Sequence, residues 1–140
     1  MRVIALDYGS ARCGCAVSDP TGTLATPIEP VLAAGSRRGR ARLRGLVEHY
    51  DAQLVLVGLP LSLSGGDSAQ TVEAREFAAS LERSLPVPVR MCDERFTTQL
   101  AQRIGGRTSE DSRAAAHLLE GWLVGEAARA ARERGDDGDG

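Results

Sequence analysis

The chain begins with two short apolar runs that follow one another closely. The first covers residues 1–8 and the second residues 12–18. Each has the length of a strand, and the short connection between them predicts an antiparallel hairpin. A third apolar segment, residues 24–32, is interrupted by two prolines. Because proline cannot donate to a β-ladder, this pattern predicts an edge strand.

The rest of the chain alternates between helical apolar spacing and strand-like apolar runs. In chain order the pattern predicts a helix over 38–50, a strand over 53–60, a helix over 69–85, a strand over 88–94, a short helix from Thr97 or Thr98 to Ile104, and a helix from Asp111 to about Arg132. Strands reached through helical crossovers lie parallel to one another. The sequence therefore predicts an α/β fold: a mixed five-stranded sheet, three antiparallel strands and then two parallel ones, flanked by helices.

Length and composition are those of one globular domain. The 140 residues are 42% hydrophobic and 26% charged, which suits a single core. We expect one domain over residues 1–132 and a disordered acidic tail over 133–140. No run approaches the roughly 20 apolar residues of a membrane span, and the N-terminus lacks a signal-peptide pattern. Three cysteines without a C-x-x-C pair predict free thiols, and a cytoplasmic protein with no membrane partner.

Charge does not by itself indicate a nucleic-acid partner. The net charge is −2, all 17 basic residues are arginine, and five of them fall between Arg37 and Arg44. This run could follow phosphates, or it could form a solvated helix face. The second interpretation is slightly favoured, because no aromatic residue is interleaved as in a stacking groove.

Three acids occupy positions that suggest chemistry. Asp7 ends the first strand, Glu94 ends the fifth beside Asp93, and Asp111 opens the last helix. In open sheets, ligands bind at the carboxyl ends of the strands, where these acids would meet. Asp93 and Glu94 point to opposite faces of their strand, so at most one enters the site. Taken singly, Asp7 could bind turn N–H groups, and Asp111 could be a first-turn acid favoured by the helix dipole.

Carboxylates that converge in a cleft repel one another unless a cation lies among them. An oxygen-rich site without histidine suits Mg²⁺ or Mn²⁺ better than Zn²⁺. Two such ions, roughly 4 Å apart, can activate water and stabilise the leaving oxygen in phosphodiester hydrolysis. The acids therefore predict a metal-dependent nuclease.

Four blocks of the sequence resemble, in order and spacing, the signatures of the YqgF/RuvX family. They are "ALDYGSARCGCAVSD", "VGLPLSLSGGDSAQT", "DERFTT" and "EDSRAAAHLLEGWL". The family has a ribonuclease H-like fold. Its members are described as Holliday junction resolvases, or as nucleases that mature the 5′ end of pre-16S ribosomal RNA. The resemblance implies a hydrolase that cuts structured nucleic acid with Mg²⁺ or Mn²⁺.

The resemblance also assigns residues. It places the catalytic, metal-binding role on Asp7, Glu94 and Asp111, and substrate contacts on Arg12, Arg95 and Thr98. The loop after "VGLPL" departs from the family, with serine at positions 62 and 64 where asparagine and aspartate are common. Cys13 and Cys15 stand where aliphatic residues are usual, so we expect them to be small core residues.

Several functions remain open at this point. Ribosomal RNA 5′-end maturation in ribosome biogenesis is favoured, and resolution of branched DNA in recombination and repair is the alternative. Two symmetric cuts in a four-way junction predict a two-fold homodimer. A phosphotransfer enzyme of the sugar kinase and actin-like class would need a second domain that 140 residues do not supply. A non-catalytic nucleic-acid-binding module would not need three acids placed against a polyanion.

Overall fold

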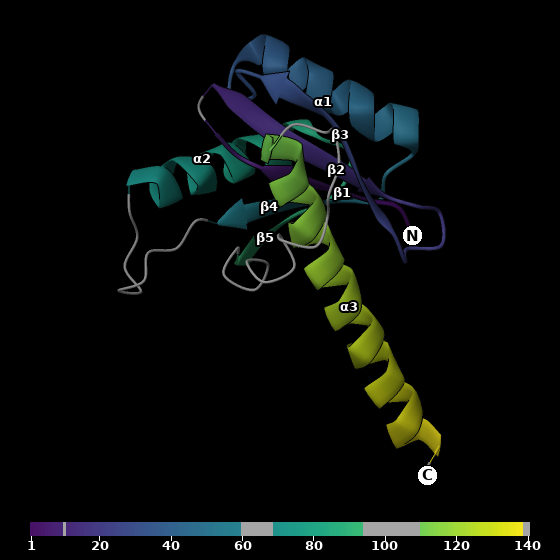
Figure 1. Cartoon of the computed structure of the whole chain (residues 1–140). Coiled ribbons are helices and arrows are strands. Elements are labelled where there is room, and N and C mark those ends of the chain that lie inside the picture. Colours follow the sequence, from purple (N-terminus) through teal and green to yellow (C-terminus); the bar gives the residue numbers. More distant parts are fainter. Residues whose placement is uncertain (10, 60–68, 94–109, 139–140) are drawn as a thin grey trace.

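Five strands form one mixed sheet, in the order β3-β2-β1-β4-β5 (Figure 1). The computed structural model describes residues 1–9, 11–59, 69–93 and 110–138. The strands are β1 Val3–Asp7, β2 Arg12–Ser18, β3 Ala25–Leu32, β4 Leu54–Leu59 and β5 Val89–Asp93. β2 is antiparallel to both β1 and β3, whereas β4 is parallel to both β1 and β5. This is the predicted sheet, with the proline-containing β3 at one edge.

Helices cover both faces of the sheet (Figure 1). They are α1 Arg37–Tyr50, α2 Ala69–Ser84 and α3 Glu110–Gly138. Leu43 and Val47 of α1 and Phe77 and Leu81 of α2 belong to the core on one face. The core on the other face is closed by α3, chiefly through small and leucine side chains. Among the described residues, no helix has both the length and the hydrophobicity to cross a membrane.

Local signals fix both ends of α1. The Ser36 hydroxyl accepts a hydrogen bond from the Gly39 N–H at 3.0 Å, which caps the first turn. At the other end Asp51 adopts the left-handed conformation (φ 53°), and its N–H group bonds the last carbonyls. Strand and helix boundaries in the described part of the chain otherwise lie within a residue or two of those expected.

The last helix is longer than its pattern indicated. It runs to Gly138 rather than ending near Arg132, so residues 133–138, expected to belong to a disordered tail, are helical. Its C-terminal half extends well beyond the sheet (Figure 1). A helix already nucleated by packing propagates at little cost per residue, which explains how a polar segment can continue it. The short helix expected from residue 97 or 98 to 104 lies outside the described residues.

Candidate active site at the carboxyl ends of the parallel strands

The parallel strands end together at one edge of the sheet. Leu6 of β1 pairs with Val57 of β4, and Leu59 of β4 pairs with Asp93 of β5. Asp7 therefore lies at the edge where the sequence placed it. Glu94 follows β5 directly and lies outside the described residues.

Strand alternation decides which face Asp7 occupies. Val3 and Ala5 belong to the core under α3, while Ile4 and Leu6 belong to the core under α1 and α2. Successive side chains of a strand point to opposite faces. The side chain of Asp7, which is half-buried, thus falls on the α3 side.

Glycines flank Asp7 on both neighbouring strands. Gly14 of β2 is its direct partner. On β4, the position after the Leu6–Val57 pair is Gly58, which is buried. By alternation both glycines face the α3 side, so neither neighbouring strand places a side chain next to the carboxylate there. Gly58 lies beside Asp7 only because of the register between β1 and β4, which no local sequence pattern indicates.

A buried serine fixes the first turn of α3 beside this edge. The Ser112 hydroxyl donates to the carbonyl of Ile28 in β3 and accepts from the N–H of Cys15 in β2, at 3.4 Å. Cys15 follows Gly14 and pairs with Leu6. The backbone of Asp111, one residue before Ser112, is therefore held over the strands next to Asp7. The side chain of Asp111 lies outside the described part of the structure.

Ser112 was missed in the sequence, although a signal was present. It occupies the first position of the apolar stripe that continues through Ala115, Ala116 and Leu119, and its side chain is fully buried. A polar side chain on the buried stripe of a helix must find partners in the core. A serine at that position next to a candidate catalytic acid therefore indicates a structural hydrogen bond.

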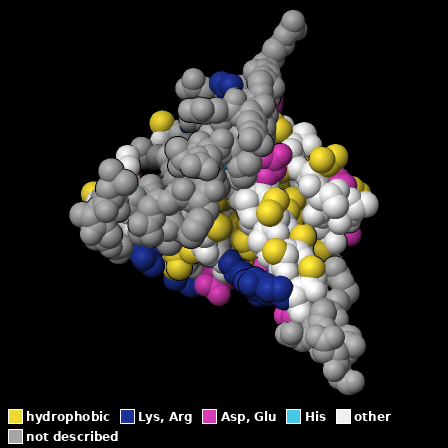
Figure 2. Space-filling view, turned by 60° about the horizontal axis from the view of Figure 1, so that its bottom comes forward, with side chains coloured by type: hydrophobic (Ala, Val, Ile, Leu, Met, Phe, Trp, Pro, Cys, Tyr) yellow, Lys and Arg dark blue, Asp and Glu magenta, His cyan; other side chains and the backbone are white. Residues whose placement is uncertain are grey.

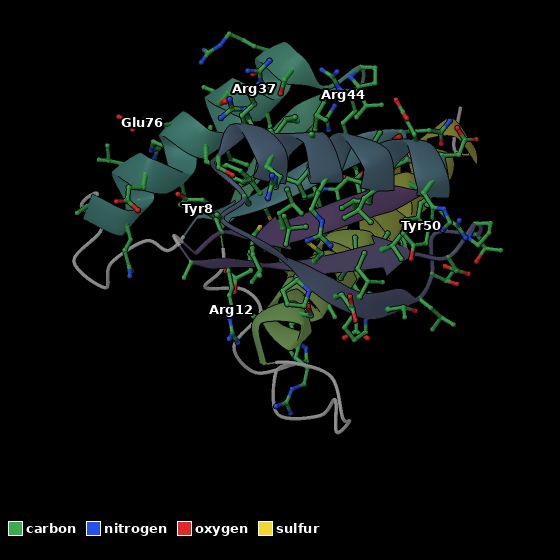
Figure 3. All side chains as sticks on the ribbon, turned by 90° about the horizontal axis from the view of Figure 1, so that it is seen from above. Tyr8, Arg12, Arg37, Arg44, Tyr50 and Glu76 are labelled. Carbon is green, nitrogen blue, oxygen red and sulfur yellow. The ribbon has the colours of Figure 1, made fainter. Side chains whose placement is uncertain are left out.

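Arg12 is the one predicted substrate contact within the described residues. It begins β2 at the same edge as Asp7, and its side chain is exposed. Figure 3 shows it at the same end of the sheet as Tyr8, extending toward the start of α3. A cation is thus available on the face that carries Asp7. Arg95 and Thr98 lie outside the described residues.

Tyr8 lies at the same end of the sheet as Asp7 but on the opposite face, against the core under α1 and α2. Its ring stacks on Phe77 of α2, with centroids 4.5 Å apart and planes 23° from parallel. Burial raises the pKa of the Tyr8 hydroxyl, and the nearby Glu73 carboxylate raises it further. Gly9 follows in a tight turn, where an added Cβ would lie 2.5 Å from the Arg12 carbonyl oxygen. Gly9 is therefore required by the turn itself.

Three side chains capable of metal binding or proton transfer, Cys13, Cys15 and His117, lie in the core. Cys13 and Cys15 form no disulfide and are fully buried on the α1 and α2 side, as expected of small core residues. His117 is buried on α3, with Nδ1 4.0 Å from Glu120. It lies six residues beyond Asp111, about 9 Å along the helix, and so is not part of the first turn.

The donor chemistry near Asp7 fits a hard divalent cation. The neighbouring strand positions on its α3 side are glycines, and the predicted companions Glu94 and Asp111 would add only oxygen ligands. Within the described residues no group of three histidine, cysteine or acidic side chains is close enough to hold a metal. Asp7 is the one predicted ligand whose side chain the structure describes, so the complete ligand set remains a prediction.

Comparison with known proteins establishes the relationship of the chain. A family model described as "RuvX: Holliday junction resolvase" matches residues 1–125. The chain belongs to the RuvX family. RuvX relatives include a protein of Koribacter versatilis, 48% identical over 103 residues, which are 74% of this chain and 67% of the relative. Another, from Mycolicibacterium smegmatis, is 42% identical and covers 98% of this chain and 89% of its own length. Both carry the name "Putative pre-16S rRNA nuclease".

Solved structures show that this RuvX chain has a ribonuclease H-like fold. RuvC of T. thermophilus, solved in complex with a Holliday junction substrate, superposes with a TM-score of 0.64 at 13% identity, covering 91% of this chain and 96% of RuvC. The Holliday junction resolvase of fowlpox virus gives a TM-score of 0.53 at 14% identity, covering 89% and 99%. At such identities the likeness concerns the fold. Family and fold together make the chain a member of a nuclease family that acts on phosphodiester bonds.

Proposed function

We propose that this RuvX chain is a divalent-metal-dependent endonuclease that matures the 5′ end of pre-16S ribosomal RNA in the cytoplasm. The observation that carries the proposal is the placement of Asp7. It lies at the carboxyl edge of the parallel strands, on the α3 side, between two glycines and beside a helix start fixed by Ser112. The names of the relatives support ribosomal RNA as the substrate.

The metal ligands we propose are Asp7, Glu94 and Asp111. Cys92 of β5 packs against the α3-side core. If the alternation of β5 continues by one residue, Glu94 falls on the same side as Asp7, while Asp93 falls on the other. This supports the choice of Glu94 over Asp93 that the sequence and the family resemblance had already indicated.

When bound, Mg²⁺ or Mn²⁺ at these carboxylates would supply Lewis-acid stabilisation of charge on the phosphate and activation of a water molecule. Side chains of the protein would bind and orient the substrate. Arg12, with Arg95 and Thr98, would bind the nucleic-acid backbone and orient the scissile phosphate toward Asp7. The packing of α3 on the sheet would keep the acids at fixed separations, so that little reorganisation is needed on binding.

The test offers a pre-16S fragment and a four-way DNA junction to the protein in parallel, with Mg²⁺ or Mn²⁺. We expect metal-dependent cleavage of the RNA by the wild-type protein and a loss of at least about 100-fold in Asp7→Asn, Glu94→Gln and Asp111→Asn. Asp93→Asn is the matched control, because it neutralises the neighbouring acid on the other face, and it should retain activity. Full activity of Asp7→Asn would exclude the proposed site.

Junction resolution is the second candidate function, favoured by the description of the family model. It requires two symmetric cuts and hence a two-fold homodimer. Paired cleavage of the junction by a dimer, with the RNA left intact, would establish this function in place of RNA maturation. Molar mass measured by light scattering during the same experiment distinguishes the two.

A further inference from the structure

The arginines of α1 form a feature that the proposed active site does not use. Five of them fall between Arg37 and Arg44, and no acid follows until Glu48. Four are exposed and Arg40 is half-buried. On the face of the molecule in Figure 2, by contrast, the described side chains of both charges are interspersed with apolar ones. The stretch of α1 from Arg37 to Arg44 therefore carries five cations and no acid.

Within the described part of the chain, none of the five arginines forms an ion pair with an acidic side chain, although Glu73 and Glu76 line a hollow with Arg40 and Glu29 lines a cleft with Arg42. The polar contacts made by the five guanidinium groups are with main-chain carbonyls: Arg40 donates to Gly35 at 2.6 Å, and Arg44 donates to Ser84 of α2. The first turn of α1 contains no acid. Several cations near a helix N-terminus are disfavoured by the helix dipole, so an anionic partner would relieve this arrangement.

Helical spacing divides the five residues into two rows. Arg37, Arg40 and Arg44 are three and four residues apart, which places them on one side of α1. Figure 3 shows Arg37 and Arg44 on the same side, toward α2. Arg38 and Arg42 form the second row, four residues apart, and Arg42 lines the cleft between α1 and β3. The first row is about 10 Å long at 1.5 Å per residue.

The first row begins at the same end of the sheet as Asp7 but on the opposite face, which α1 and α2 cover. An added Cβ on Gly35, just before α1, would lie 3.5 Å from the Tyr8 hydroxyl. Arg40 and Tyr8 line one hollow of about 330 Å³ together with two acids of α2, Glu73 and Glu76. From there the row follows α1 away from the edge, so a strand that leaves the site near Tyr8 meets Arg37 and Arg40 first and Arg44 last. Glu76 would keep phosphates on the α1 side of the hollow.

We propose that Arg37, Arg40 and Arg44 bind the phosphate backbone of the substrate outside its cleavage site. The inference rests on the proposed function only in taking the substrate to be a nucleic acid. Arginine suits the role because its planar, permanently charged group makes paired hydrogen bonds to phosphate. The row is the length of a short stretch of backbone, which gives a surface that holds flanking sequence without reading bases.

The test measures binding of a long and a short RNA duplex in EDTA, so that no cleavage is required. Each phosphate contact contributes about 0.7 to 0.9 to the slope of log K against log salt. In Arg37→Gln/Arg44→Gln we expect the slope for the long duplex to fall by about 1.4 to 1.8, with roughly tenfold weaker binding at low salt. The short duplex, which ends before α1, should be little affected.

Two matched variants make the result decisive. Arg38→Gln/Arg42→Gln removes the same charge from the same helix on the other row and should leave the slope unchanged. Arg37→Lys/Arg44→Lys keeps the charge and should keep most of the slope. Thermal unfolding confirms that each variant is folded. Equal slopes in both glutamine variants, or a wild-type slope in Arg37→Gln/Arg44→Gln, would overturn the inference. Since cleavage is assayed separately with Asp7→Asn, this failure is distinct from failure of the proposed nuclease activity.

Discussion

Replacing Ser112 by alanine tests the contact that fixes the start of α3. The hydroxyl joins the Cys15 N–H of β2 to the Ile28 carbonyl of β3 and is fully buried. Alanine removes one acceptor and one donor from buried main-chain groups, and each group left unpaired costs about 1–3 kcal/mol. The Ile28 carbonyl oxygen has a second lone pair, so the cost of losing its hydrogen bond lies at the low end of this range. We therefore expect a loss of about 2–4 kcal/mol in the free energy of unfolding.

Urea unfolding at neutral pH measures this loss directly. The midpoint should fall while the slope m stays constant, because the surface exposed on unfolding is the same. For a chain of this length the corresponding fall in Tm is roughly 6–14 °C. Well below Tm, Ser112→Ala should also need more Mg²⁺ for half-maximal cleavage, because Asp111 is then held less firmly.

Ser84→Ala is the matched control. Ser84 donates to carbonyls within its own helix, at 3.1 Å to Ser80 and 3.4 Å to Leu81, so its loss should stay within about 0.5 kcal/mol. If Ser112→Ala costs no more than Ser84→Ala, the buried bridge does not stabilise the fold. If its stability falls but its Mg²⁺ requirement is unchanged, the bridge supports the fold without positioning Asp111.

Three further outcomes follow from the structure. Gly39→Ala should destabilise the fold by about 1–3 kcal/mol in urea unfolding, because the added Cβ would lie 2.2 Å from the Ala33 carbonyl oxygen; an unchanged midpoint would contradict this contact. Asp19→Asn should lower stability at neutral pH. The Leu24 N–H and the Thr21 hydroxyl hold the pKa of Asp19 well below its usual range, so its contribution is present above the unfolded-state pKa of about 3.9 and is lost as pH falls below it. Unfolding curves of both proteins should therefore converge on acidification, and a constant difference would argue against the charge. Removing divalent metal with EDTA should abolish cleavage and leave the circular dichroism spectrum unchanged, whereas cleavage that persists in EDTA would refute the metal-dependent mechanism.

Much of the scaffold was predictable because its signals are local. Periodicity gave the five strands, and Pro27 and Pro30 identified the edge strand that the sheet order confirms. The end of α3 was wrong because the acidic, glycine-containing segment after Arg132 has low intrinsic helix preference. The pattern could not reveal that a long helix already packed on the sheet would continue through it.

In the candidate site too, some residues were predictable from local sequence and others were not. Asp7 was predictable because its position at the end of a buried strand is visible in the sequence. The roles of Gly58 and Ser112 depend on strand register and on contacts between residues far apart in the chain, which no local pattern encodes.

The order of elements along the chain has a consequence for synthesis. The strands β1, β2 and β3 leave the ribosome first, and α3, which covers one face of them, leaves last. Until then, the nascent chain carries Asp7 on an uncovered apolar face, and Ser112 has yet to reach Cys15 and Ile28. Formation of the site must wait for a long-range docking step, which is slow compared with hairpin formation. With the proposed site of Asp7, Glu94 and Asp111, we expect a nascent chain that has emerged only as far as β5 to be inactive toward RNA and to expose an apolar face that chaperones can bind.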